Sequence, residues 1–268
     1  MNRLKQTFEN LKKKNDRALV GFVTAGDPDV DTSLKLIKAM CENGVDILEL
    51  GVPFSDPSAD GPVIQRSSLR ALKHDVSLKT VMSMVRKIRK FCDIPIIIFS
   101  YYNPILAYGA RKFQPDSLAA GADGVLVVDL PLEESTELTS MWEDREFSLI
   151  NLVAPTTPKD RMAKIAAASS GFLYMVSKTG VTGSDGLDTS KIGEQMKILR
   201  SVTNFPVCVG FGISTAEDVA AVAAMADGVV IGSAFERLIE ENIDHPELIA
   251  RMGNQTAAYK AATNLKKS

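Results

Sequence analysis

The sequence is poor in the residues that most often carry metal sites, disulfides and acid–base catalysis. Its 268 residues include two histidines, His74 and His245, which are too few for a three-histidine metal site. Three widely spaced cysteines, Cys41, Cys92 and Cys208, cannot build a multi-disulfide framework, and their odd number is typical of a reducing compartment. We therefore expect a cytoplasmic protein with Cys208 in its core, in which carboxylates perform the acid–base chemistry.

The sequence also lacks an excess of one charge and a long apolar run. Lysine and arginine number 31 against 33 acidic residues, which argues against a protein built mainly around nucleic-acid electrostatics. A membrane span needs about 20 apolar residues, and the longest runs, Val219 to Ala226 and Ile94 to Phe99, are far shorter. The N-terminal segment has no apolar stretch typical of a secretory signal. Instead, Leu4, Phe8 and Leu11 have helical spacing and predict a short amphipathic helix.

What the sequence does contain is a regular alternation of two patterns. Short β-rich runs predict eight strands, at 18–23, 46–50, 95–100, 124–129, 148–153, 172–176, 206–209 and 228–231. Amphipathic periodicity predicts helices between them, at 32–43, 78–91, 133–145, 158–169, 191–201, 215–225 and 234–241, with a final helix at 246–264.

Repeated βα units of this kind fit two α/β architectures, a closed barrel and an open doubly wound sheet. Eight strands, the chain length and the absence of GxGxxG after the first strand favour the barrel. We predict a single domain over residues 1–268, a (β/α)8 TIM barrel with an added N-terminal helix and extra helices. In such barrels the active site lies at the C-terminal ends of the strands.

A carboxylate stands in the second predicted strand where a core residue is expected. Because side chains alternate between the two faces of a strand, Leu48 and Leu50 share one face. Ile47, Glu49 and Gly51 share the other. The all-apolar face should meet the helices, so Glu49 is predicted to point into the barrel. Burial raises the pKa of a carboxyl group, which can then act as both general acid and general base. A structural salt bridge to a core lysine or arginine is the alternative.

The loop after this strand, residues 51–62, is long for a βα connection and holds two more carboxylates. Asp60 precedes Gly-Pro and an apolar helical pattern. It is therefore either part of a helix entry or a second acid facing the same cavity as Glu49, and spacing alone does not decide between them. Hard cations prefer oxygen ligands, so a divalent metal site is a third possibility. Its ligands would be Glu49, Asp56, Asp60 and Asp129.

Glycine-rich segments follow the last three predicted strands, at 180–184, 210–214 and 232–234. Glycine lets backbone N–H groups approach an anion closely, and a helix N-terminus adds a favourable dipole. Because loops after strands seven and eight commonly bind phosphate in these barrels, we predict a phosphate site there. Ser233 would add a hydroxyl donor, and no lysine or arginine is required. The polar segment 177–190 is predicted to act as a lid.

Four motifs together resemble the family of the tryptophan synthase alpha subunit. They are ELGVPFSDPSADGP at 49–62, SKTGVTG at 177–183, GFGIS at 210–214 and IGSA at 231–234. Their order and spacing match over nearly the whole chain, from Phe8 to the last predicted helix. The resemblance implies a barrel that cleaves indole-3-glycerol phosphate into indole and glyceraldehyde 3-phosphate by a retro-aldol reaction.

The resemblance also implies roles for single residues. Glu49 would protonate the indole ring carbon and then take the proton of the glycerol hydroxyl next to the breaking bond. Asp60 would bond the indole N–H and stabilise the positive charge that develops there. The phosphate ligands would be Gly183, Gly212, Gly232 and Ser233. The pocket for the rest of the substrate would consist of Phe22, Phe99, Tyr101, Leu126, Leu152, Tyr174, Thr182 and Phe211.

Members of this family bind a beta subunit in an αββα assembly, to which they pass indole. The resemblance therefore implies that pyridoxal phosphate belongs to the partner, and that this chain holds neither a cofactor nor a metal. The expected contact residues are Pro53, Asp56, Asn103 and Pro131. Neither nucleic acid nor a membrane is expected as a partner.

Two alternatives to this lyase remain open at the level of sequence. One is another phosphate-binding barrel enzyme, such as a sugar-phosphate isomerase or a thiamine-phosphate synthase, which would need a different base or a metal. The other is a non-catalytic barrel that only binds and activates the beta subunit.

Overall fold

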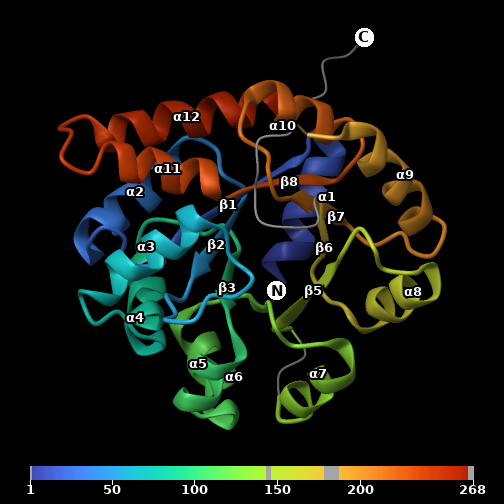
Figure 1. The fold of residues 1–268 in the computed structure, drawn as a ribbon, viewed down its shortest axis with the longest axis horizontal. Helices are drawn as coiled ribbons and strands as arrows, with labels where there is room; N and C mark the ends of the chain where they lie inside the picture. The colour runs from blue at the N-terminus through green and yellow to red at the C-terminus, as the bar shows by residue number, and fades with distance from the viewer. Residues whose placement is uncertain (1, 143–145, 178–186, 265–268) are drawn as a thin grey trace.

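Eight parallel strands close into a barrel in which each strand pairs with its neighbour in chain order and β8 pairs with β1 (Figure 1). This computed structural model describes residues 2–142, 146–177 and 187–264. The strands are β1 (Ala18–Thr24), β2 (Ile47–Gly51), β3 (Ile96–Ser100), β4 (Gly124–Val127), β5 (Ser148–Val153), β6 (Leu173–Val176), β7 (Val207–Gly210) and β8 (Gly228–Ile231). The TIM-barrel prediction is confirmed, and each predicted strand begins and ends within two residues of the observed one.

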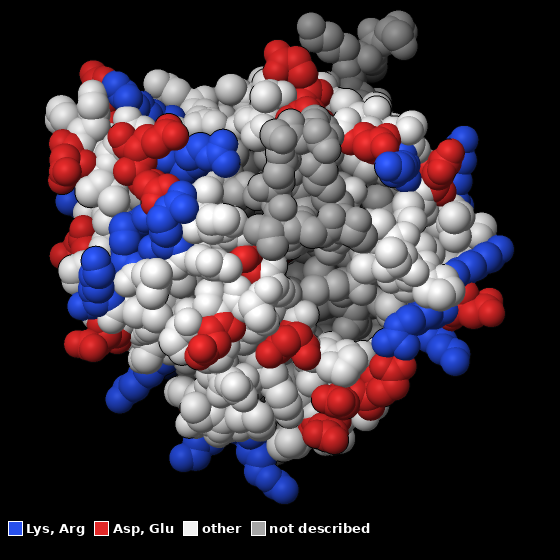
Figure 2. Space-filling model, in the orientation of Figure 1, with Lys and Arg blue, Asp and Glu red and all other residues white. Residues whose placement is uncertain are grey.

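Helices form a ring around the strands (Figure 1). In the described part of the chain they are α1 (Arg3–Lys14), α2 (Val30–Glu42), α3 (Pro62–Leu72), α4 (Leu78–Ile88), α5 (Tyr102–Tyr108), α6 (Ala110–Ala120), α7 (Leu132–Thr139), α8 (Lys159–Ala168), α9 (Thr189–Arg200), α10 (Ala216–Ala223), α11 (Ser233–Glu241) and α12 (Leu248–Ala262). None of these is long and apolar enough to cross a membrane. Acidic and basic side chains mix around the edge of the face in Figure 2, in line with the small net charge of −2.

The alternation of side chains along β2 divides the core as predicted. Ile47 belongs to the apolar cluster inside the barrel, whereas Leu48 and Leu50 belong to the cluster between the strands and the helices. Glu49 therefore shares the inner face with Ile47. The strand register aligns Glu49 with Phe22 of β1 and with Ile97 of β3.

The N-terminal helix α1 packs its apolar stripe against the inside of the barrel. Leu4 and Leu11 are buried, and the rings of Phe8 and Phe172 lie 5.9 Å apart between centroids. All four residues contribute to the inner cluster, and α1 lies behind the strands in Figure 1. The predicted amphipathic helix therefore covers one end of the barrel.

The connection between β3 and β4 differs from the prediction. It holds two short helices, α5 and α6, which apolar periodicity did not predict. Gly109, with φ 110°, separates the two helices, and Pro115 lies inside α6. Both residues argue against a helix in a sequence pattern, since proline removes a backbone donor and glycine weakens helical preference. Helix α7 is also shorter than predicted and ends at Thr139.

Candidate active site

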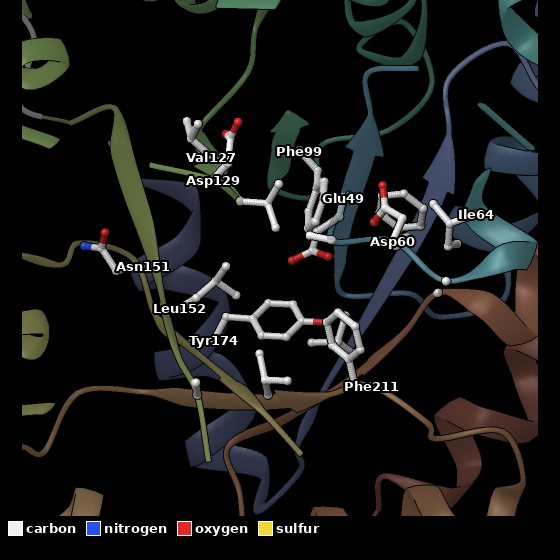
Figure 3. A pocket seen from close by; sticks show the side chains of 18 of the residues that line it. Glu49, Asp60, Ile64, Phe99, Val127, Asp129, Asn151, Leu152, Tyr174 and Phe211 are labelled. Carbon is white, nitrogen blue, oxygen red and sulfur yellow. The ribbon is translucent and has the colours of Figure 1, made fainter. Parts of the chain in front are cut away.

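A cavity of about 790 Å³ opens at the C-terminal ends of the strands (Figure 3). Its walls come from strands β1 to β6 and β8, from the loops that follow β2, β4, β5, β7 and β8, and from the first turns of α3 and α11. The residues predicted from the sequence that line it are Phe22, Glu49, Asp60, Phe99, Pro131, Leu152, Tyr174, Phe211, Gly212, Gly232 and Ser233. The chain thus brings carboxylates, aromatic rings and glycines together from positions more than 200 residues apart.

Glu49 is a buried carboxyl group that faces this cavity. Its side chain lies between Phe99 and Tyr174 in Figure 3, and the residue is 1% exposed. Among the described residues nothing donates a hydrogen bond to its Oε1 atom. Burial raises the pKa of Glu49 to about 8, because no nearby charge compensates the loss of water around the ionised form. The alternative of a structural salt bridge fails, since none of the ion pairs among described residues involves Glu49.

Asp60 is the second carboxylate of the cavity, and it lies at the entry of α3. Gly61 is the N-cap of that helix and Pro62 its first residue, so the Asp60 side chain does not cap it. Instead, the Tyr101 hydroxyl donates a hydrogen bond to Asp60 Oδ2 at 3.0 Å. Burial raises the pKa of Asp60 to about 6, and the bond from Tyr101 opposes that rise. Of the two alternatives that the spacing left open for Asp60, the structure supports a side chain that faces the same cavity as Glu49.

The possible metal site does not form. The Ser55 hydroxyl donates to Asp56 Oδ2 at 2.6 Å, and Asp129 Oδ1 accepts from the backbone N–H of Tyr102 at 2.7 Å. In residues 2–142, 146–177 and 187–264 no three acidic, histidine or cysteine side chains gather in a way that could hold a metal ion. The four possible ligands therefore do not form one metal-binding group, although Glu49, Asp60 and Asp129 line the same cavity.

The described glycines of the phosphate site lie at two neighbouring turns. Gly232 is the N-cap of α11 and has no side chain that could cap the helix, and both Gly232 and Ser233 line the cavity. The first backbone N–H groups of α11 therefore have no side-chain partner from the N-cap residue. Helix α10 differs, because Thr215 and Asp218 form a capping box that occupies its N-terminus. We use the name glycine cradle for Gly212, Gly232 and Ser233.

The turn after β7 has an unusual backbone. Phe211 has φ 84° and Gly212 has φ 77°, a region that a bulky residue adopts only under strain. The Ser177 hydroxyl donates to the carbonyl oxygens of Gly210, at 2.8 Å, and of Phe211. This turn directs the Phe211 ring at the cavity, where it packs edge-on against Tyr174 with centroids 6.4 Å apart.

Among the described residues, the cavity wall offers no unpaired basic side chain. Arg161 is the basic residue among those that line the cavity, and both of its terminal nitrogens bond Glu133, at 2.6 and 2.9 Å. A phosphate held here would therefore depend mainly on backbone N–H groups and on the Ser233 hydroxyl.

Other predicted residues lie away from the cavity wall. Tyr101 is buried behind Asp60, and Leu126 packs inside the barrel in the inner cluster. Gly183 and Thr182 lie outside the described residues, as does most of the segment predicted to be a lid. Of the expected partner contacts, Asp56, Asn103 and Pro131 are exposed, whereas Pro53 is buried in the chain itself.

The sequence interpretation missed several residues of the cavity wall. Among them are Ile64 in the first turn of α3, Val127 at the end of β4, and Asn151 on β5 next to Leu152 (Figure 3). The sequence could have predicted Ile64 as a cavity residue, because it follows Asp60 by about one helical turn. The indication for Asn151 is weaker: it is a polar residue within an otherwise apolar strand.

Comparison with known proteins reveals the relatives of this chain. The family model described as tryptophan synthase alpha chain matches residues 8–264. A tryptophan synthase alpha chain of Desulfatibacillum aliphaticivorans is 62% identical, over 98% of this chain and 99% of that protein. Another, from Desulfosudis oleivorans, is 61% identical over 99% and 100% of the two chains.

Solved structures agree with the sequence relatives. The tryptophan synthase alpha chain of Legionella pneumophila superimposes with a TM-score of 0.91 at 36% identity, covering 100% of this chain and 99% of that one. Tryptophan synthase of Mycobacterium tuberculosis gives a TM-score of 0.90 at 33% identity, over 98% and 99% of the two chains.

Proposed function

Because this chain belongs to the tryptophan synthase alpha chain family, we propose that Glu49 and Asp60 carry out the reaction of that family in its cavity. Members of the family are lyases that cleave indole-3-glycerol phosphate in tryptophan biosynthesis and work with a beta subunit. The observation that carries the proposal is one cavity with two carboxyl groups whose pKa values differ, about 8 for Glu49 and about 6 for Asp60. Such a pair supports one acid and one anion at neutral pH.

Glu49 is the group that moves protons. With a pKa of about 8 it is mostly protonated at pH 7, so it can protonate the indole ring carbon at the bond to be broken. The resulting Glu49 carboxylate then takes the proton of the adjacent glycerol hydroxyl. As that O–H bond breaks, a carbonyl forms, the carbon–carbon bond cleaves, and its electron pair returns to the indole ring.

Asp60 is the group that stays charged. Its pKa of about 6 leaves it mostly ionised at pH 7, and the Tyr101 hydroxyl holds one of its oxygens. Protonation of the ring carbon puts positive charge on the indole nitrogen. A carboxylate bonded to that N–H stabilises the intermediate more than the neutral substrate, which is the condition for lowering the barrier.

The glycine cradle would bind the phosphate at the other end of the substrate. The N-terminus of α11 supplies backbone donors and a favourable dipole, and Ser233 supplies a hydroxyl. We propose Gly183, of the segment predicted to be a lid, as a further phosphate ligand and Thr182 as a pocket residue. The aromatic wall of Phe22, Phe99 and Phe211 would enclose the indole ring.

Pyridoxal phosphate sits in the beta subunit of these enzymes, and we propose that this chain works without a cofactor or a metal ion of its own. The exposed residues Asp56, in the loop after β2, Asn103, in the first turn of α5, and Pro131, in the loop after β4, would form part of the surface for the beta subunit in an αββα assembly. A cytoplasmic location is proposed from the cysteine content of the sequence.

The decisive test is indole release from indole-3-glycerol phosphate by the purified chain, alone and with the beta subunit. Wild type should release indole in both preparations, and Glu49→Gln should abolish release while inorganic phosphate still binds. Asp60→Asn should also lose activity, because a neutral amide cannot stabilise the indole cation. Glu134→Gln, an exposed carboxylate change on α7, is the matched control and should leave turnover unaltered.

Two results would contradict the proposal. Substantial indole release by Glu49→Gln would remove Glu49 from its role. No turnover by wild type in either preparation, despite complex formation with the beta subunit, would indicate a non-catalytic barrel instead.

A further inference from the structure

Two helices, α3 and α11, begin at the two ends of the proposed substrate site. Asp60 directly precedes the N-cap of α3, and Gly232 is the N-cap of α11. The two helices pack against each other and against β1. Their relative position therefore sets the separation between the carboxylate for the indole end and the cradle for the phosphate end.

A buried ionic contact joins these two helices to a third segment. Arg70 of α3 donates to both oxygens of Asp27, from Nε at 2.7 Å and from Nη2 at 2.8 Å. Its remaining nitrogen, Nη1, donates to Glu240 of α11 at 2.9 Å. The side chain of Asp27, in the loop after β1, is 0% exposed, so this two-bond pair is shielded from water.

A second path runs between the same helices through the end of β1. Glu236, in the first turn of α11, is fully buried and accepts a hydrogen bond from the backbone N–H of Thr24 at 2.6 Å. The Thr24 hydroxyl bonds the Ser67 hydroxyl of α3 at 2.7 Å. Ser67 in turn donates to the carbonyl of Ile64, a residue of the cavity wall.

Glu236 lies beside the ionic contact of Asp27 with Arg70. Burial and the neighbouring Asp27 raise the pKa of Glu236 well above its usual range. Asp27, whose side chain is fully buried, pairs with Arg70. Acidic and basic side chains meet over α3 and α11 in Figure 2, where this contact reaches the surface.

We propose that Asp27, Arg70, Glu236 and Glu240, here called the helix clamp, are positioning residues that hold α3 and α11 at the separation needed to bind both ends of one substrate molecule. This inference rests on the proposed lyase function, since it assumes that Asp60 and the glycine cradle bind the two ends. The clamp residues touch neither end, so they act through the helices. Misplacement of reacting groups by about 1 Å can cost a hundredfold in rate.

If the helix clamp sets this separation, its loss should weaken the reaction of the whole substrate more than the binding of either half of it, indole or inorganic phosphate. The substrate spans both helices, whereas indole alone and inorganic phosphate alone each need one end. Arg70→Lys keeps the charge but loses the two-bond contact to Asp27. It should lower kcat/KM for indole-3-glycerol phosphate about tenfold or more while the dissociation constants of indole and of inorganic phosphate change less than about twofold.

Arg89→Lys is the matched control. Arg89 directly follows α4 and, like Arg70, is a mostly buried arginine that bonds an aspartate, Asp123, at 2.6 Å, but it contacts neither α3 nor α11. This variant loses a comparable ionic contact outside the clamp, so it should retain the kcat/KM of wild type. A drop equal to that of Arg70→Lys would overturn the proposal.

Ser67→Ala is a second variant that keeps the proposal testable if Arg70→Lys does not fold. It removes the hydroxyl link between Thr24 and α3 with a small change in volume, and it should show the same split between whole and half ligands to a smaller extent. Equal losses for whole and half ligands in these variants, or no loss for the whole substrate, would overturn the clamp. Wild type that fails to cleave the substrate would instead overturn the proposed function.

Discussion

The hydroxyl of Tyr101 donates a hydrogen bond to Asp60 Oδ2 at 3.0 Å, and it accepts one from the backbone N–H of Ala59 at the same distance. Tyr101 follows β3, so this single hydroxyl fixes the loop before α3 to the neighbouring strand. A donor favours the ionised form of a carboxyl group, and the bond therefore opposes the effect of burial on the pKa of Asp60. The geometry keeps an anion where the proposed reaction needs one.

Tyr101→Phe should raise the pKa of Asp60 above its value of about 6. Because the ionised form is the active one, the loss of activity on acidification should then begin at a higher pH than in wild type. We expect kcat/KM near pH 5 to fall about tenfold, the equivalent of about 1.4 kcal/mol. The measurement is the pH profile of indole release, with Tyr102→Phe as control, since the Tyr102 ring packs on the outer core and does not line the cavity. An unchanged acidic limb would refute this role of Tyr101.

Glu49→Gln should change how stability depends on pH. Burial raises the pKa of Glu49 from 4.5 to about 8, so the unfolded chain loses this proton at lower pH than the folded chain. Wild type therefore loses stability as pH rises from about 4.5 to about 8, and this loss is absent below 4.5. The variant has no such proton to lose. The difference in melting temperature, wild type minus Glu49→Gln, should fall between pH 5 and pH 8, as measured by thermal unfolding, and a constant difference would contradict the buried acid.

The features of this protein that could be predicted are those that depend on local sequence patterns. Short runs of apolar and β-branched residues predicted the positions of the eight strands that the structure describes. The alternation of side chains along β2 predicted that Glu49 points into the barrel. Barrel geometry then places the ends of parallel strands together, so residues far apart in sequence were expected in one site. Glu49, Tyr174 and Gly232 do meet in one cavity.

What the sequence could not reveal depends on side chains that meet only in the fold. Asp27 and Arg70 are 43 residues apart, and no motif around either residue predicts that they form an ion pair. Leu126 has the inward direction expected of a pocket residue, but its side chain packs in the inner cluster and is not among the residues that line the cavity. Helices α5 and α6 were missed because Gly109 and Pro115 resemble loop signals when tertiary packing is not considered.

Gly232→Ala should weaken phosphate binding without harming the fold. The backbone of Gly232 has a negative φ of −125°, so it lies outside the positive-φ region that favours glycine. A methyl group there would meet the Phe22 ring at 3.4 Å, an ordinary contact, so the melting temperature should stay close to that of wild type. The same methyl group would extend over the first backbone N–H groups of α11. We expect about 1.4 to 2.8 kcal/mol of lost affinity, or about ten- to a hundredfold, for inorganic phosphate by calorimetry.

Gly193→Ala is the control for this change. Gly193 lies inside α9, where a methyl group would meet Met225 Sδ at 3.4 Å, and alanine is the better helix former. This variant should bind phosphate as wild type does. Retained phosphate affinity in Gly232→Ala would show that the phosphate does not approach this helix N-terminus.

The three cysteines should react with thiol reagents in a fixed order. Contact with the Cys41 thiol, the nearby Ile94 backbone and the Arg89 charge lower the pKa of Cys92 to about 6, and Cys92 is partly exposed. Its partner Cys41 has a raised pKa, because it donates to Cys92 and is largely buried. Cys208 is 0% exposed inside the barrel, and burial raises its pKa as well.

Since the thiolate is the reactive form, iodoacetamide at pH 7 should label Cys92 first, Cys41 slowly and Cys208 only after unfolding. Peptide mass mapping over time measures all three rates, and Cys92→Ser should remove the fast phase. Labelling of Cys208 at the rate of Cys92 in the native protein would mean that the inner cluster opens to solvent, against the close packing that holds the barrel together.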